Sequence, residues 1–132
     1  MQITEERIRA AAEATLERWP AASAVLLFGS RARGDHLPSS DWDLAVVTDE
    51  PQNRPPNLPL LDLAERHPPA IDVAFISGDE IRRHRNLLGR LGCSLAHDAR
   101  PIAGNWSRPA GLKEPEVDHE MYLEEISNSL RL

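Results

Sequence analysis

The sequence predicts one α/β domain in which a small sheet is covered by helices. Its 132 residues fit a single compact domain. Three short apolar runs, at residues 22–28, 41–48 and 71–76, have the length and composition of buried strands. Stretches with helical periodicity lie before, between and after these runs, and this alternation is typical of the α/β class.

The chain opens with a predicted helix that ends at Pro20. Thr4 can cap this helix, and the two glutamates that follow place negative charge in its first turn, where the helix dipole favours it. Apolar residues then recur at helical spacing from Ile8 to Trp19. One face of the helix is therefore expected to pack against the sheet.

The first two strands flank a polar segment. The strand at residues 22–28 ends at a glycine, and residues 30–40 predict a loop with room for one helical turn. Side chains alternate between the faces of the second strand, residues 41–48. Asp41 and Asp43 therefore point the same way.

An exposed connection and a short helix precede the third strand. Four prolines within residues 49–59 prevent this segment from continuing the sheet. A short helix is expected near residues 60–64. The strand at residues 71–76 then places Asp72 on the face opposite to Ile71.

Two further helices are predicted toward the C-terminus. A Ser-x-x-Glu capping box at residues 77–80 predicts a helix that stops at Gly92. Its apolar face would carry Ile81, His84, Leu88 and Leu91. One short strand is expected within residues 94–103, and a last helix over residues 115–132. The apolar stripe of that last helix would consist of Tyr122, Leu123, Ile126 and Leu130.

Bulk composition narrows the classes of function. The net charge of −6 disfavours long nucleic acid, because such binding depends on Lys and Arg that replace counterions. The longest apolar run, residues 21–28, is far shorter than the roughly 20 residues of a membrane span. The single cysteine, Cys93, cannot form an internal disulfide, and we therefore expect a cytoplasmic protein.

Three aspartates are candidates for metal binding. Asp41 and Asp43 share a strand face with Cα atoms about 6.5–7 Å apart. Mg²⁺ usually takes one or two protein carboxylates and fills its shell with water and phosphate oxygens. Two such ions, about 3.5–4 Å apart, can stabilise the attacking and leaving oxygens of an in-line displacement. Asp72 could complete the set, although a carboxylate at a strand start can also be a cap or a surface charge.

Gly29 and Ser30 are candidates for phosphate binding. Glycine lets the backbone approach a phosphate, the amides of such a turn form an anion-binding concavity, and the serine hydroxyl adds a donor. Either Arg31 or Arg33 could neutralise a triphosphate or a leaving pyrophosphate, and the sequence does not choose between them. A lone Gly-Ser or Asp-x-Asp is usually a turn or a solvated strand end, but their joint spacing predicts a nucleotide site.

These motifs together resemble a known family. Gly29-Ser30, ten residues and then Asp41-Trp42-Asp43 resemble the Gly-Ser-x10-Asp-x-Asp signature of the DNA polymerase beta-like nucleotidyltransferases. The longer form, residues 29–34 followed by 40–44, resembles the minimal nucleotidyltransferases (MNT) of bacteria and archaea. The resemblance implies the nucleotidyltransferase fold, with a small mixed sheet flanked by helices.

The resemblance also implies roles for the matching residues. The Gly29-Ser30 turn would hold the triphosphate of ATP or another NTP. Asp41 and Asp43 would bind magnesium, with two ions expected, and Asp72 matches the third carboxylate, which the family takes from a later strand. All three aspartates would thus belong to the catalytic site.

Members of this group are frequently antitoxins whose helical HEPN-class toxin is silenced by adenylylation of a tyrosine. The resemblance therefore implies transfer of AMP to a hydroxyl of such a partner. Residues 1–107 would form the catalytic core, and residues 108–132 a helical extension for contact with a partner or a second copy. Two alternatives stay open: a non-catalytic antitoxin that acts by binding, and an enzyme that modifies a small molecule such as an aminoglycoside.

Overall fold

A four-stranded mixed sheet lies at the centre of the protein. The structure is a computed structural model and describes residues 2–118 and 120. Strand β1 (Ala22–Phe28) is antiparallel to both of its neighbours, β2 (Trp42–Thr48) and β5 (Arg100–Gly104). Strand β3 (Ile71–Ile76) pairs in parallel with β2, so the order is β3-β2-β1-β5. The predicted small mixed sheet is confirmed.

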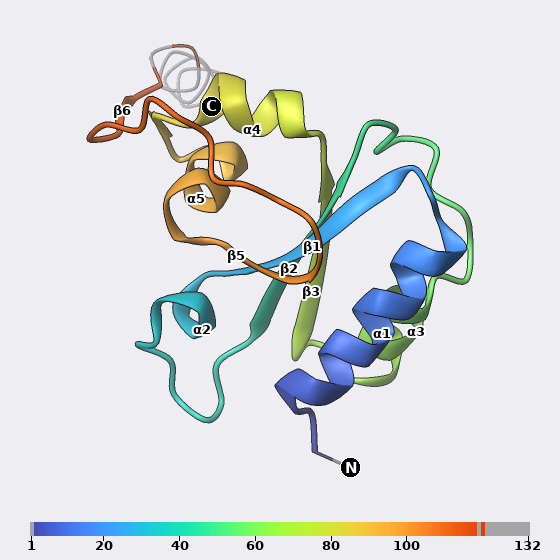
Figure 1. Ribbon diagram of the computed structural model, residues 1–132. Helices are drawn as coiled ribbons and strands as arrows, with labels where there is room; N and C mark the ends of the chain where they lie inside the picture. The colour runs from blue at the N-terminus through green and yellow to red at the C-terminus, as the bar shows by residue number, and fades with distance from the viewer. Residues whose placement is uncertain (1, 119, 121–132) are drawn as a thin grey trace, which may run out of the picture.

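Helices cover both faces of this sheet (Figure 1). Helices α1 (Glu5–Arg18) and α3 (Pro59–Arg66) lie on one face, and α4 (Gly78–His84) and α5 (Leu91–Asp98) lie on the other. The single turn α2 (Ser30–Arg33) follows β1 directly. Among the described residues, no helix combines the length and apolar character required to cross a membrane.

The apolar core is divided by the sheet into two clusters. Alternation along the strands sends Leu27 and Leu44 toward α1 and α3, while Leu26 and Ala45 face α4 and α5. All four side chains are fully or almost fully buried. This pattern of burial accounts for the strand bounds, because each strand ends where its residues become exposed to solvent.

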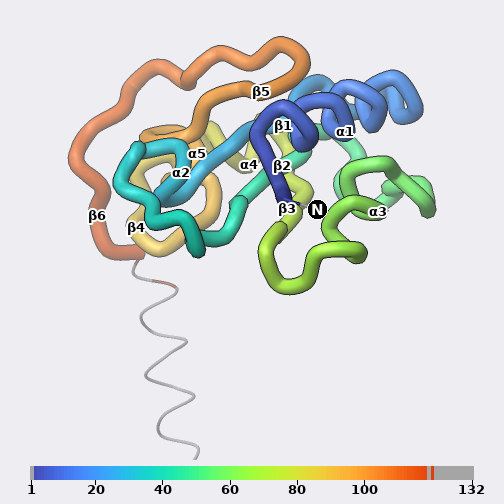
Figure 2. The backbone as a smooth tube through the Cα atoms, turned by 90° about the horizontal axis from the view of Figure 1, so that it is seen from below, coloured from blue at the N-terminus to red at the C-terminus, as the bar shows by residue number. Residues whose placement is uncertain are grey.

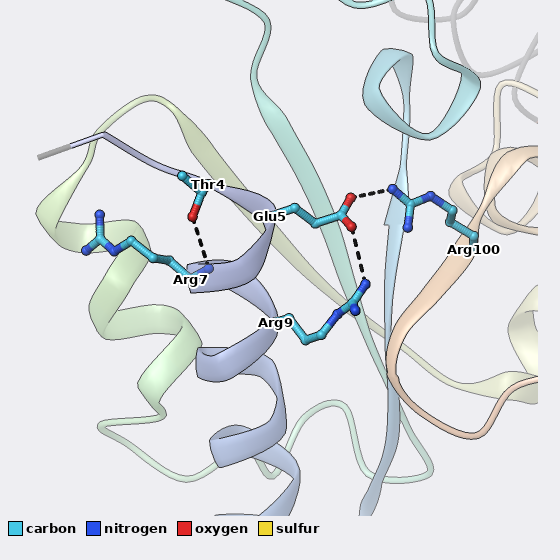
Figure 3. Close-up of polar contacts among 5 residues, drawn as sticks. All are labelled: Thr4, Glu5, Arg7, Arg9 and Arg100. Carbon is cyan, nitrogen blue, oxygen red and sulfur yellow. Dashed lines mark hydrogen bonds and ion pairs between the residues drawn. The ribbon is translucent and has the colours of Figure 1, made fainter.

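Helix α1 begins as the sequence predicts (Figure 3). The Thr4 hydroxyl accepts a hydrogen bond from the backbone amide of Arg7 at 3.2 Å, which satisfies one amide of the first turn. Glu5 lies between two arginines, Arg9 one turn ahead on the same helix and Arg100 at the start of β5. This pair of contacts connects the start of α1 to the edge of the sheet.

The predicted helix from the capping box to Gly92 is wrong in its second half. The Ser77 hydroxyl does accept from the amide of Glu80 at 3.1 Å, but the helix ends at His84. Leu88 belongs to a two-residue strand, β4 (Leu87–Leu88), and Gly92 lies inside α5. A Cβ at Gly92 would lie 2.9 Å from the Cβ of His84, so this glycine permits α4 and α5 to pack closely and does not end a helix.

The start of the predicted C-terminal helix is also wrong. Strand β6 (Glu116–Val117) pairs in parallel with β4, and the amide of Glu116 donates to the carbonyl of Asn86 at 2.9 Å. These backbone bonds hold the segment extended where a helix was expected from residue 115. The apolar stripe predicted for this helix, Tyr122, Leu123, Ile126 and Leu130, lies outside the described residues.

Candidate active site

Two of the predicted aspartates stand side by side at one end of the sheet. Asp43 in β2 and Asp72 in β3 are register partners, and parallel strands run about 4.8 Å apart. Both lie on the same strand face as residues that pack toward α4 and α5, so their carboxylates lie on that side of the sheet. Asp41 is exposed and directly precedes β2. The structure therefore brings Asp43 and Asp72 together, with Asp41 beside them.

The pKa of the Asp43 carboxyl group is raised in the folded protein. Partial burial raises its pKa, and the negative charges of Asp72 and then Asp41 raise it further. The positive charge of Arg33 acts in the opposite direction but does not cancel these effects. Folding thus concentrates negative charge at this end of the sheet, and a bound cation would relieve the repulsion.

Gly29 faces the same carboxylate. It follows β1, and its backbone angles, φ 74° and ψ −158°, fall in a region that only glycine adopts readily. A Cβ at this position would overlap Oδ2 of Asp43 and would lie 3.3 Å from its Cγ. Only a residue without a side chain allows the turn after β1 to lie directly against Asp43.

The turn that starts at Gly29 can accept an anion. Its carbonyl accepts hydrogen bonds from the amides of Ala32 and Arg33, both at 3.1 Å, and these bonds close α2. The first amides of a helix have no acceptor within that helix, and they point out of its N-terminal end. Ser30, the first residue of α2, adds its half-buried hydroxyl at the same place. These donors lie beside Asp43, where a phosphate and a cation could be bound together.

Arg31 points away from this turn and holds the loop that leads to β2. Its Nε donates to the carbonyl of Ser40 at 3.0 Å and its Nη2 to the carbonyl of Pro38 at 3.2 Å. The guanidinium carbon also lies 4.0 Å from the centre of the Trp42 ring. These three contacts occupy the arginine with protein groups.

Arg33 lies on the side of the carboxylates. Its Nε is 3.2 Å from Asp35, its Nη1 is 3.6 Å from Asp98 at the end of α5, and its charge lowers the pKa of Asp43. The side chain is exposed and can exchange these partners for a phosphate. Of the two arginines, the geometry favours Arg33 as a phosphate ligand.

A cavity of about 640 Å³ adjoins the same end of the sheet. It is bounded by the β1–β2 loop, the N-terminal segment and the loop before β3, which gather when the molecule is seen from below (Figure 2). Ser40 and Trp42, the two neighbours of Asp41, line it. Its ionisable lining groups are Arg31, His36 and His67, and no acidic side chain lines it. None of the three predicted aspartates is among its described lining residues, and Trp42 packs on the face of the sheet opposite to Asp43, so the cavity lies beside the carboxylates and does not contain them.

The donor set fits a magnesium ion that is shared with a substrate. In the part of the chain that the structure describes, no group of three or more His, Cys, Asp or Glu side chains is arranged to hold a metal ion. Mg²⁺ needs only one or two carboxylates from the protein when phosphate and water oxygens supply the rest. Asp43 and Asp72 provide such a pair, and burial followed by the charges of Asp72 and Asp41 raises the pKa of Asp43, effects that a bound cation would offset.

Two features at this end of the sheet have no signal in the sequence. Asp98 reaches Arg33 from α5, a helix that the sequence pattern did not predict. The cavity depends on His36 and His67, which lie 31 positions apart and show no common motif. Only the folded chain brings these residues to the end of the sheet.

The chain is similar to known proteins in its sequence family and in its fold. A family model described as a nucleotidyltransferase domain matches residues 8–92, which include every predicted site residue. A solved toxin-antitoxin structure with AMP-PNP shares the fold, with a TM-score of 0.50 and 18% identity, covering 98% of this chain and 89% of that chain. No curated protein matches the sequence.

Two further structures are similar at lower TM-scores. A candidate nucleotidyltransferase from Sulfolobus solfataricus has a TM-score of 0.49 and 21% identity, covering 83% of this chain and 85% of that chain. A complex of tri-AMPylated Shewanella oneidensis HEPN toxin with MNT antitoxin has a TM-score of 0.44 and 15% identity, covering 77% and 74% of the two chains.

Proposed function

Because the chain belongs to the nucleotidyltransferase domain family, we propose that it transfers AMP from ATP to a hydroxyl group of a protein partner, a helical toxin of the HEPN class. One observation carries the proposal: the Gly29 turn lies against Asp43, and Asp43 is in register with Asp72. A phosphate-binding turn and a pair of carboxylates are thereby placed side by side. This is the arrangement that a metal-dependent transfer of a nucleotide requires.

The triphosphate is assigned to the turn and to Arg33. The amides at the start of α2 and the Ser30 hydroxyl bind phosphate oxygens, and Gly29 leaves room for them beside Asp43. Arg33 neutralises the charge that develops on the leaving pyrophosphate. Arg33 can do so because its present partners, Asp35 and Asp98, are exposed and bind it weakly.

Magnesium is assigned to the three aspartates. Asp43 and Asp72 supply the paired carboxylates, and Asp41 supplies a third oxygen ligand from the start of β2. When bound, the ions would neutralise negative charge on the triphosphate and on the attacking oxygen. Two ions are expected from the number of carboxylates.

The acceptor hydroxyl approaches from the side of β3. This strand is at the edge of the sheet, and Asp72 is exposed there. The acceptor oxygen forms a bond to the α-phosphorus, the bond from that phosphorus to the bridging oxygen breaks, and pyrophosphate leaves. Asp72 is the candidate to accept the proton of the hydroxyl, either directly or through water.

The choice of ATP and of a toxin partner is supported by fold. One structure that covers 98% of this chain is a toxin-antitoxin structure with AMP-PNP, an ATP analogue. The single buried cysteine fits a reaction in the reducing cytoplasm. Within residues 2–118 the chain forms one α/β unit, and we assign the acceptor hydroxyl to a protein partner.

Co-expression with the product of the neighbouring gene tests the proposal. We expect the intact mass of that product to increase by one or more AMP units with the wild-type chain, and not with Asp43→Asn. Asp49→Asn is the matched control, because Asp49 follows the other end of β2 and is exposed. A stable complex with an unmodified partner would contradict AMP transfer and identify an antitoxin that acts by binding alone. Transfer to an added aminoglycoside but not to the protein would contradict the toxin partner.

A further inference from the structure

We infer that Arg31 is a positioning residue for Asp41, and that it holds this carboxylate in place through the backbone on both sides of it. The inference rests on the proposed function, in which Asp41 is a magnesium ligand. It assigns different roles to the two arginines after the Gly-Ser turn: Arg33 would bind phosphate, whereas Arg31 would bind backbone carbonyls of its own chain. Neither role is visible in the sequence, where both arginines follow Ser30 within three residues.

The contacts of Arg31 flank Asp41 along the chain. Its Nε binds the carbonyl of Ser40, the residue before Asp41, at 3.0 Å. Its guanidinium covers the ring of Trp42, the residue after Asp41, at 4.0 Å. A third contact, from Nη2 to the carbonyl of Pro38 at 3.2 Å, extends the hold to the loop. Both residues bonded to Asp41 are therefore fixed by one side chain.

Asp41 needs such support because the sheet does not provide it. Strand β2 begins at Trp42, whose amide donates to the carbonyl of Ala70 at 2.8 Å, and Asp41 lies outside this ladder. The preceding residues, 35–39, are exposed. Two local bonds close a short turn within the loop: the amide of Ser40 donates to the carbonyl of Leu37, and the amide of Leu37 donates to the Ser40 hydroxyl. The start of the loop is bonded to α2 through Asp35, whose amide donates to the carbonyl of Ser30 at 3.2 Å and whose carboxylate pairs with Arg33. Arg31 connects α2 to the other end of the loop, next to Asp41.

Arg31 also connects the loop before β2 to the proposed phosphate-binding turn. Arg31 belongs to α2, the turn that follows Gly29 and is proposed to bind the triphosphate. The side chain thus sets the distance between the phosphate-binding turn and Asp41. Arginine suits this role better than lysine, because its planar group can donate to two carbonyls and stack on an aromatic ring at the same time.

Three variants and two binding measurements test the inference. Arg31→Ala removes all three contacts, and Arg31→Lys keeps the charge but not the planar group. Arg54→Ala is the matched control, because Arg54 also covers an aromatic ring, that of Phe75 at 4.7 Å, and lies outside the proposed site. Mn²⁺ replaces Mg²⁺ so that metal affinity can be measured by electron paramagnetic resonance in the presence of AMP-PNP.

We expect Arg31→Ala to weaken Mn²⁺ binding by about tenfold, as the loss of a residue that orients a metal ligand does. Arg31→Lys should lose less, and Arg54→Ala should match the wild type. Affinity for a fluorescent ATP analogue in EDTA should stay unchanged in Arg31→Ala. A loss of that metal-free affinity, as expected for Arg33→Ala, would overturn the inference and make Arg31 a phosphate ligand.

Amide hydrogen exchange separates this inference from the proposed function. In the absence of metal and nucleotide, the amides of residues 35–42 should exchange faster in Arg31→Ala than in the wild type, and at the wild-type rate in Arg54→Ala. Unchanged exchange over these residues would overturn the positioning role whatever the enzyme does. Failure of the wild-type chain to bind Mn²⁺ with AMP-PNP would instead remove the proposed function.

Discussion

Gly29 and Asp43 lie so close that a single methyl group on Gly29 would overlap the Asp43 carboxylate. The two residues are 14 positions apart, at the end of one strand and the start of its antiparallel neighbour. Their contact places the turn after β1 beside the carboxylates of β2 and β3. The proposed binding of phosphate next to magnesium depends on this approach.

Replacement of Gly29 by alanine should impair both stability and nucleotide binding. We expect Gly29→Ala to lower the free energy of unfolding by about 1–3 kcal/mol, because alanine does not tolerate this backbone conformation. The added methyl group should also displace Asp43, so binding of AMP-PNP with Mg²⁺ should be lost. Chemical denaturation and titration calorimetry measure the two effects.

Gly34→Ala is the matched control for this variant. Gly34 also has a positive φ, 84°, but no atom lies within 4 Å of the position of its Cβ. A comparable loss of about 1–2 kcal/mol is expected from backbone strain alone, with nucleotide binding retained. Equal nucleotide affinity in the two variants would show that the approach of Gly29 to Asp43 does not matter for the site.

Removal of the Asp43 charge should stabilise the metal-free protein. The pKa of Asp43 is raised in the folded state, so its ionisation destabilises the fold as pH rises above the ordinary carboxyl range. Asp43→Asn should therefore have a higher Tm than the wild type at pH 7 in EDTA. The difference should shrink toward pH 3, where the wild-type carboxyl is protonated in both states. A lower Tm for Asp43→Asn at pH 7 would contradict a destabilising effect of the ionised Asp43 carboxylate. Asp49→Asn is the control, because Asp49 is exposed.

Gly92 should be required for the packing of α4 against α5. A Cβ at this position would lie 2.9 Å from the Cβ of His84 and 3.0 Å from the carbonyl oxygen of Glu80. We expect Gly92→Ala to destabilise the protein by about 1–3 kcal/mol through overpacking, although alanine favours a helix more than glycine does. In Gly78→Ala the nearest atom is the mobile end of Arg82 at 3.4 Å, so that control should keep its stability. Equal stability of the two variants would argue against close helix packing.

Cys93 should react slowly with thiol reagents. Its side chain is buried, and burial, followed by the charge of Asp98, raises the pKa of the thiol. At pH 8 the thiolate fraction is therefore low and access is limited. We expect modification by a colorimetric disulfide reagent to be much slower in the native protein than in denaturant. Equally fast reaction in both conditions would place Cys93 at the surface.

The parts of the fold that local chemistry determines could be predicted from the sequence. The strand at residues 22–28 was predicted with its observed bounds, because it is a continuous apolar run closed by glycine. The caps at Thr4 and Ser77 were also correct, since each needs only a side chain and an amide three residues away. The period of a strand placed Asp41 and Asp43 on one face, whereas the register that brings Asp72 beside Asp43 depends on the fold.

The errors arose where contacts distant in the sequence decide the structure. Gly92 has the pattern of a helix stop, but the close approach of α4 gives it another role. Glu116 has the pattern of a helix start, but pairing with a strand almost 30 residues earlier keeps it extended. The roles of Arg31 and Arg33 could not be separated either. The two arginines lie two positions apart, and the sequence does not show that one side chain reaches Ser40 while the other faces Asp98.

The origin of the transferred group tests the central proposal most directly. The purified chain and the product of the neighbouring gene would be incubated with Mg²⁺ and ATP labelled at either the α- or the γ-phosphate. We predict that α-label appears on the partner protein, that γ-label does not, and that Asp43→Asn abolishes the transfer while Asp49→Asn does not. Transfer of γ-label, or equal transfer by Asp43→Asn, would contradict a nucleotidyl transfer at this site.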